Sequence, residues 1–273
     1  MRFYAIFIYL FLYAPIGMII LISFSEGRQA SSFRGFSLQW YETAFSNRFV
    51  LEALGNSLSI GFVSATLAAT FGTMAALALQ RVKGPLRRVY DALIYTSLMI
   101  PAIVIGIATL IALATARDIV NEALLSLSPE APKLQLGWGS IVAAHTLFNL
   151  ALVIVIVRAR IGGMDRSLIE ASTDLYATPW GTFRQVTLPL ILPAVIAGFL
   201  LSFTFSFDDY VIASFVNGSE VTLPIFVFGS IRRGLTPEVN AIATVVLTVS
   251  ALLLVSAQFL LRERGKRSTV RTA

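Results

Sequence analysis

Few side chains in this sequence can do chemistry. There is no cysteine and one histidine, His145, which excludes disulfide frameworks, thiolate metal sites and any site built from several imidazoles. The strongest remaining candidates are the adjacent carboxylates Asp208 and Asp209, which end a long apolar run and need a cavity or a partner in such surroundings. They predict contact with an ammonium group, helped by cation–π attraction from Tyr210 or Phe207. A solvated loop or a helix cap is the alternative interpretation.

His145 and the two aspartates do not form a hydrolytic pattern. His145 lies within an apolar run, where a neutral imidazole bonded to another helix is favoured over a proton or substrate role. An intramembrane hydrolase would need paired aspartates inside spans or a Ser/His pair deep in a bundle. Asp208 and Asp209 are neighbours at the end of one run, so we expect neither catalytic residues nor a metal site.

The composition places these residues in a membrane protein. Of the 273 residues, 56% are hydrophobic and only 13% are charged, and the mean hydropathy is +0.79. A soluble chain of this size keeps roughly a quarter of its residues charged to cover its surface. Much of the surface of this chain must therefore face lipid and not water.

Six uncharged apolar runs are long enough, at about 20 residues of helix, to cross a bilayer core. They cover residues 3–22, 56–79, 92–116, 139–157, 188–207 and 241–261. The first is expected to be a retained helix and not a cleaved signal peptide, because no small-x-small cleavage site follows it. No repeat, low-complexity tract or linker divides the chain, so residues 1–273 are predicted to form one all-α membrane domain.

Between the last two spans lie two shorter apolar stretches, 210–216 and 221–231, which are too short to cross. Turn-forming residues at 217–220 separate them, so we expect a re-entrant or interfacial element. Pro101, inside the third span, predicts a kink or an unwound turn. Thr236, Pro237 and Glu238 have the pattern of N-cap, first-position proline and first-turn acid, which predicts the start of the last helix.

The distribution of charge predicts the orientation in the membrane. With six spans both termini share a side, and the loops on that side hold fourteen of the 21 Lys and Arg residues, against seven on the other side. The positive-inside rule therefore places both termini in the cytoplasm. Ten of the fifteen acids fall in the outer loops, and the resulting outer charge of −3 favours a cationic solute. Because the basic segments border spans, nucleic acid is not an expected partner.

The inner loop at 158–187 carries the most distinctive pattern. Asp165 or Ser167 is placed to cap a short helix with Glu170 in its first turn. Thr178 followed by Pro179 predicts a second short helix, which we expect to end before Pro189. Apolar residues mixed with charges give this loop a surface suited to docking into a groove on a soluble partner; they are Leu168, Ile169, Leu175 and Phe183.

This loop resembles the signature of the permease subunits of ABC importers, which reads Glu-Ala-Ala, three residues, Gly, nine residues, Ile, one residue and Leu-Pro. The chain has the same spacing throughout, with Glu170, Ala171, Ser172, Tyr176, Val186, Leu188 and Pro189 at the motif positions. Tyr176 is the main departure, because glycine at that position would permit a left-handed turn at little cost. Tyrosine predicts a turn that is strained or differently shaped.

The resemblance extends along nearly the whole chain and is nearest to the spermidine/putrescine-type permeases, to which residues 36–41, 56–58, 202–216 and 237–241 are similar. It implies the type I importer permease fold in a bacterial inner membrane: six transmembrane helices and a cytoplasmic coupling loop. It also implies transport of putrescine or spermidine, delivered by a periplasmic or extracellular binding protein. Another amino-containing or opine-like solute is the alternative. A secondary transporter is more remote, because those folds commonly show internal repeats.

The resemblance also implies partners. A second, related permease in a heterodimer, two cytoplasmic ATPases and a solute-binding protein would complete the importer. The sequence contains no G-x-x-x-x-G-K-[ST], so ATP and Mg²⁺ are expected on the ATPase chains, and this chain is expected to be a transport subunit without a cofactor and not an enzyme. The residues implied to couple it to the ATPases are Glu170, Ala171, Ser172, Asp174, Leu175, Tyr176, Pro179, Leu188 and Pro189. Glu170 is expected to orient the loop by pairing with an arginine or with backbone N–H groups.

Overall fold

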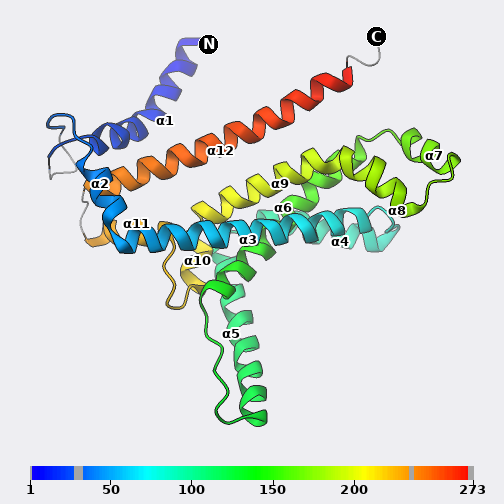
Figure 1. Ribbon diagram of the computed structural model, residues 1–273, viewed down its shortest axis with the longest axis horizontal. Coiled ribbons are helices and arrows are strands. Elements are labelled where there is room, and N and C mark those ends of the chain that lie inside the picture. Colours follow the sequence, from blue (N-terminus) through cyan, green and yellow to red (C-terminus); the bar gives the residue numbers. More distant parts are fainter. Residues whose placement is uncertain (1, 28–32, 234–236, 270–273) are drawn as a thin grey trace. The chain divides into compact units, whose positions relative to one another are not determined.

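The protein folds almost entirely into helices (Figure 1). The structure, a computed structural model, describes residues 2–27, 33–233 and 237–269, with side chains no further than residue 255. In chain order the helices are α1 (Arg2–Ser23), α2 (Gln39–Ser46), α3 (Arg48–Ala78), α4 (Pro85–Met99), α5 (Ala102–Leu127), α6 (Trp138–Gly162), α7 (Ser167–Asp174), α8 (Pro179–Thr182), the π-helical turn η1 (Phe183–Thr187), α9 (Leu188–Asp208), α10 (Val211–Val216), α11 (Leu223–Arg233) and α12 (Pro237–Thr269).

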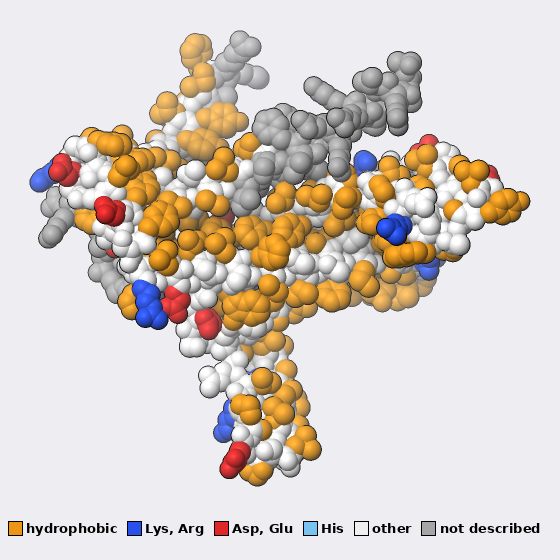
Figure 2. Space-filling view, viewed as in Figure 1, with side chains coloured by type: hydrophobic (Ala, Val, Ile, Leu, Met, Phe, Trp, Pro, Cys, Tyr) orange, Lys and Arg blue, Asp and Glu red, His pale blue; other side chains and the backbone are white. Residues whose placement is uncertain are grey.

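Five helical segments in the described ranges are long and apolar enough to cross a membrane: α1, α3, α5, α6 and the continuous segment from α8 to α9. The sixth predicted span lies in α12, which begins at Pro237 as expected, whereas its predicted cap Thr236 lies outside the described residues. In both α1 and α5, only 11% of the most apolar 18-residue stretch is buried inside the protein. Figure 2 shows hydrophobic side chains over much of the visible surface and few charged ones, as expected of helices that contact lipid.

The third span begins later than the sequence predicted. We expected it at 92–116, but α4 ends at Met99 and α5 runs from Ala102 to Leu127. Pro101 has no N–H, and its ring pushes the preceding residue out of the helical region. Ile100 accordingly has extended backbone, with φ −67° and ψ 131°. The predicted unwound turn is therefore present, and it divides the apolar run into two separate helices.

One compact unit consists of residues 1–57 and 221–252. Side chains of α2 hold the segment that follows α1: the hydroxyls of Ser23 and Tyr41 share a hydrogen bond of 2.7 Å, and the indole N–H of Trp40 donates to the carbonyl of Ser25 at 2.8 Å. The ring of Phe24 stacks on Phe36, with centroids 5.3 Å apart. These contacts hold the described residues that directly follow α1 against α2 and the residues before it.

In the same unit Asn47, just before α3, and Ser57 of α3 bind the beginnings of α12 and α11. The amide of Asn47 donates to Oε1 of Glu238, in the first turn of α12, at 2.9 Å. The backbone N–H of Leu223, the first residue of α11, donates to the hydroxyl of Ser57 at 2.8 Å. Free N–H groups at a helix start need acceptors when water is absent, and Ser57 supplies one from a neighbouring helix.

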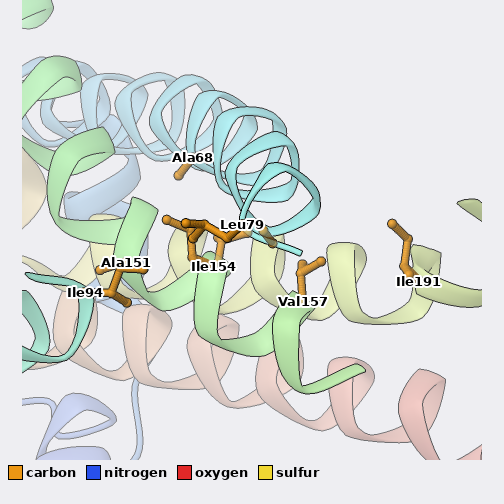
Figure 3. Packing of buried hydrophobic residues seen from close by; sticks show 9 residues of the cluster. Ala68, Leu79, Ile94, Ala151, Ile154, Val157 and Ile191 are labelled. Atoms are coloured by element: carbon orange, nitrogen blue, oxygen red, sulfur yellow. The ribbon is translucent and has the colours of Figure 1, made fainter. Parts of the chain in front are cut away.

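The second compact unit contains residues 58–220 and 253–273, and its core lies between α3, α4, α6 and α9. Figure 3 shows the side chains of this core between the helices that carry them. Its buried members are Ala68, Ala76, Leu79, Ile94, Ala151, Val153, Ile154, Val157 and Ile191. The helix α6 supplies four of them, so it is the central helix of this unit.

The closest helix packing in this core surrounds Val153, which is fully buried. A Cβ atom placed on Gly72 of α3 would lie 2.8 Å from the Cβ of Val153, and one placed on Gly198 of α9 would lie 3.4 Å from its Cγ1. Glycine at these two positions therefore lets α3 and α9 approach α6 closely. Small residues at helix contacts are the usual way in which membrane helices pack tightly.

The predicted turn at 217–220 is confirmed and lies between the short helices α10 and α11. Gly218 has a φ of +56°, and a Cβ atom there would lie 2.0 Å from the carbonyl oxygen of Leu136. On the other side of α10, the ring of Phe215 lies 2.5 Å from where a Cβ of Gly106 would be. The helix α10 is thus fitted closely against α5 and the start of α6.

We predict that Gly72→Ala destabilises the protein although alanine is the better helix former. Alanine in a helix gains up to about 1 kcal/mol over glycine, but at Gly72 its methyl group would overpack Val153, which typically costs about 1–3 kcal/mol. The control is Gly55→Ala on the same helix, where no atom lies within 4 Å of the added Cβ. Thermal unfolding in detergent should show a lower Tm for Gly72→Ala than for Gly55→Ala. Equal Tm values would contradict this account.

Candidate functional site

The residues predicted to function lie at the two ends of α9. The coupling motif ends at Leu188 and Pro189, the first two residues of α9, whereas Asp208 and Asp209 lie at its other end. Twenty-one helical residues rise by about 30 Å, close to the thickness of a bilayer core. The two groups therefore form separate sites that share one helix.

The helix α7 carries the first part of the motif and begins as the sequence predicted. The carboxylate of Asp165 accepts a hydrogen bond of 2.9 Å from the backbone N–H of Ser167. Hydrogen bonds from the N–H and the hydroxyl of Ser167 lower the pKa of Asp165, so the capping group stays charged at neutral pH. Glu170 and Ala171, both exposed, follow in the first turns of α7.

The end of α7 has the left-handed turn that the motif glycine would provide, with a tyrosine in its place. Tyr176 has a φ of +59°, the only positive φ of a non-glycine residue in the described ranges. The N–H of Ala177 donates to the carbonyl of Ser172, and that of Tyr176 donates to the carbonyl of Thr173. This hydrogen-bond pattern is the Schellman motif, in which the left-handed position normally holds glycine. The left-handed turn is therefore retained, and the backbone at Tyr176 is strained because this residue is not glycine.

A hydrogen bond of 2.9 Å between the hydroxyls of Ser172 and Thr182 joins α7 to α8. Thr178 caps α8 as predicted, with its hydroxyl accepting from the N–H of Gly181 at 3.1 Å. The prediction that this second helix ends before Pro189 is wrong, because α8 continues through η1 into α9. The wider π turn changes the hydrogen-bond pattern just before Pro189, where an unbroken α-helical pattern would require the N–H that proline lacks.

The coupling loop presents apolar side chains outward. Leu168, Leu175 and Tyr176 are 46%, 81% and 96% exposed, and Trp180, 69% exposed, stacks on the ring of Phe183. These exposed side chains are too large and too apolar for a surface that faces only water, and they favour a protein partner.

An open groove of about 950 Å³ lies between this loop and the end of α3. Glu170 lines it together with Arg81, Arg166 and the apolar Met164 and Ile169. Within the described part of the chain, the carboxylate of Glu170 has no ion-pair partner. The expected pairing of Glu170 inside the chain is thus not seen there, and its carboxylate is open to a partner protein.

An ion pair ties α4 to the end of α6 that leads into the coupling loop. The guanidinium of Arg158 donates to a carboxylate oxygen of Asp91 at 2.5 Å, and Arg87 lies 3.9 Å from the other oxygen. The hydrogen bond from Arg158 is the main cause of a lowered pKa at Asp91, so this carboxylate stays ionised. The pair fixes this end of α6 against α4.

At the far end of α9 the two aspartates have different surroundings. Asp209 accepts at one oxygen, Oδ2, from the backbone N–H of Ala213 at 2.8 Å and from Nε2 of His145 at 3.2 Å. Asp208 is exposed and Tyr210 is half-buried. Phe207 is only 2% exposed and stacks on the ring of Phe203, so its face is covered by the protein itself. The helix-cap interpretation thus describes Asp209, whereas Asp208 is exposed at the end of α9.

Sequence reasoning missed Thr182, Asp91 and Arg158. Thr182 is ten residues from its partner Ser172 across a turn, and Asp91 and Arg158 meet only because α4 packs on α6. Their residue types did not predict these contacts, because single threonines and acids next to basic segments are common in sequences and seldom indicate a site. Among the described residues no three His, Asp or Glu side chains gather as metal ligands would.

Comparison with known proteins shows that most of the chain resembles membrane subunits of transport systems. Residues 68–266 match the family described as binding-protein-dependent transport system inner membrane component. The chain is 37% identical over 259 residues to the spermidine/putrescine transport system permease protein PotC of Haemophilus influenzae, covering 94% of this chain and 95% of that protein. It is 36% identical over 260 residues to the putrescine transport system permease protein PotI of Escherichia coli, covering 94% and 89%.

Solved structures share the fold at low sequence identity. A bacterial ABC transporter involved in the import of the acidic polysaccharide alginate matches with a TM-score of 0.67 and 15% identity, over 96% of this chain and 92% of that one. The MetNI methionine ABC transporter matches with a TM-score of 0.60 and 17% identity, over 78% and 94%. The chain therefore belongs to the family of binding-protein-dependent transport system inner membrane components, the permease subunits of ABC importers, and is a transport component and not an enzyme.

Proposed function

We propose that this permease imports a small polyamine, putrescine or spermidine. The observation that carries the proposal is the likeness along nearly the whole chain to permeases named for these solutes in Haemophilus influenzae and Escherichia coli. An exposed carboxylate at the end of α9 and an excess of acids in the outer loops support it, because both attract cations. Another amino-containing or opine-like solute in the same importer class is the alternative.

The working complex would pair this chain with a second permease. The permease pair would receive solute from a binding protein outside the cell. Inside the cell it would bind two ATPases, which bind ATP and Mg²⁺. The chain acts as one permease domain in a bacterial inner membrane, with both termini in the cytoplasm. The support for this orientation is the excess of Lys and Arg in the termini and loops on the side of the membrane where the coupling segment is predicted to lie.

The coupling loop is the proposed contact with an ATPase, through Glu170, Ala171, Ser172, Asp174, Leu175, Tyr176, Pro179, Leu188 and Pro189. When ATP closes the two ATPases, each would carry a coupling loop with it. The helical segment from Pro179 to Asp208 has 30 residues and is about 45 Å long, so a displacement of α8 reaches the far end of α9 without crossing a flexible joint. This continuity supports a lever that alternately opens the inner and outer ends of the pathway.

Uptake measurements test the solute. Cells with and without this chain should be compared for uptake of labelled putrescine and spermidine, each challenged with an excess of unlabelled candidate solutes. Uptake of polyamine should disappear with the chain. Unchanged polyamine uptake, with loss of a different solute, would reject the polyamine and keep the importer.

We predict that Glu170→Lys abolishes ATP-driven uptake while the protein still inserts. The carboxylate has no ion-pair partner among the described residues, so a reversed charge should spare the fold and repel the site on the ATPase that receives it. Glu130→Lys, the same change in a predicted outer loop, is the control and should retain uptake. Normal uptake by well-expressed Glu170→Lys would remove Glu170 from the coupling role.

At Tyr176 we predict that glycine preserves coupling and valine impairs it. A non-glycine residue in the left-handed region costs about 1–2 kcal/mol, which Tyr176→Gly relieves and the β-branched side chain of Tyr176→Val increases. Tm and ATP-driven uptake should therefore rank glycine above valine, with Tyr176→Asn, which tolerates this conformation, between them. If valine and glycine perform alike, the turn does not determine how the loop docks.

For the outer site we predict that Asp208→Asn raises the KM for polyamine uptake about fivefold, as the loss of an exposed charge contact of about 1 kcal/mol implies. The difference should shrink as salt is added, because salt screens exposed charges. Glu122→Gln removes a predicted outer charge away from α9 and is the control. An unchanged KM in Asp208→Asn would assign this aspartate to a solvated surface.

A further inference from the structure

The one histidine of the chain is buried, and both of its ring nitrogens have a hydrogen-bond partner. His145 lies in α6 and is 1% exposed. Its Nδ1 lies 2.6 Å from the hydroxyl of Ser206 in α9, and its Nε2 lies 3.2 Å from Oδ2 of Asp209. Neither contact is needed for helix formation, so the ring links the last turn of α9 and the residue beyond it to α6.

The hydrogen bonds around His145 have a consistent direction. The carboxylate of Asp209 can only accept, so Nε2 of His145 is the ring nitrogen that donates, and Nδ1 accepts from the hydroxyl of Ser206. With Nδ1 as acceptor, the ring proton resides on Nε2 and points to Asp209. This tautomer is assigned from the hydrogen-bond network, in which the hydroxyl of Ser64 in α3 also lies 3.0 Å from Oγ of Ser206.

Asp209 uses the same oxygen to hold the start of α10. Its Oδ2 accepts from Nε2 of His145 and from the backbone N–H of Ala213 in the first turn of α10. The far end of α10 is held as well, because the hydroxyl of Ser140 in α6 donates to the carbonyl of Val216 at 2.6 Å. The helix α10 is thus held to α6 at both ends, at its start through Asp209 and His145 and at its end by Ser140.

We propose that His145 is a positioning residue for transport, which turns Asp209 into the protein and so fixes the joint between α9 and α10. Because the chain turns out of the helix between the two adjacent aspartates, holding Asp209 inward leaves Asp208 exposed at the end of α9. His145 thereby sets where the solute-facing carboxylate sits without touching the solute. The transport part of this proposal rests on the proposed function of Asp208, whereas the hold on Asp209 does not.

Two substitutions separate the two nitrogen atoms of the ring. The amide of His145→Asn ends near the position of Nδ1, so it keeps a partner for Ser206 and cannot reach Asp209. The side chain of His145→Gln is one methylene longer and can present its N–H₂ group to Asp209. Asn149→Leu is the control, because Asn149 is one turn away on the same helix, is equally buried and has no contact with Asp209.

The first measurement is amide hydrogen exchange across residues 209–217 in the assembled transporter in lipid nanodiscs. His145→Asn should exchange at least about tenfold faster there than the wild type, since a hydrogen bond to a charged group is lost. His145→Gln and Asn149→Leu should exchange as the wild type does. If His145→Asn leaves exchange in this segment unchanged, the proposal is overturned.

The second measurement is the rate of polyamine uptake at several pH values between about 5.5 and 8, where a histidine would titrate. His145→Asn should lose at least about tenfold in maximal rate, and His145→Gln should recover it with the pH profile of the wild type. A step in the wild-type profile that His145→Gln lacks would show that His145 acts by proton transfer and would overturn positioning. So would faster exchange in His145→Asn together with normal uptake.

Failure of the proposed solute is distinguishable from failure of this inference. If the wild-type transporter takes up no polyamine, the solute assignment is wrong, and the exchange comparison still decides whether His145 holds Asp209. The uptake comparison then uses whichever solute loses uptake when the chain is deleted.

Discussion

The contact at Val153 determines the position of α9, and both candidate sites depend on α9. Val153 packs against glycines of α3 and α9, so the three helices approach at distances that no larger residue would allow. In lipid there is little hydrophobic gain from joining two apolar helices, and close packing of this kind has to supply the association. The core of α3, α4, α6 and α9 is therefore held together mainly by close van der Waals packing around Val153.

Once α9 is placed, its two ends acquire opposite character. The end at Leu188 continues into η1 and α8 and bears exposed apolar rings, which suits a protein partner. At the other end, α9 stops at Asp208, and the carboxylate of the next residue, Asp209, accepts a hydrogen bond from the start of α10. In the proposed function, one continuous helical segment joins the end that docks an ATPase to the end that meets the cation, and this continuity is a simple mechanical basis for coupling.

Much of this arrangement follows from the sequence. Runs without charge predicted the spans, Pro101 predicted the break between α4 and α5, and Thr178 with Pro179 predicted the start of α8. The position of the third span could not be predicted, because the apolar run continues on both sides of Pro101 and hydropathy does not show which half forms the longer helix. The π turn was missed for a related reason: Pro189 usually ends a helix, and only a local change of hydrogen-bond pattern allows α8 to continue past it. The bond from Ser172 to Thr182 and the pair of Asp91 with Arg158 depend on how helices pack, which no local pattern encodes.

The π turn has a further consequence for how this chain tolerates changes in length. An α-helix rotates by about 100° for each residue, so one residue inserted into or deleted from α9 would turn the coupling loop about 100° away from its present direction. A π turn holds one residue more than an α turn, and can take up or release that residue locally. Residues 183–187 therefore contain the one extra residue between the membrane-spanning helix and the coupling loop. A one-residue deletion in this stretch would convert the π turn into an α turn and largely preserve the direction of the loop, whereas the same deletion elsewhere in α9 would not.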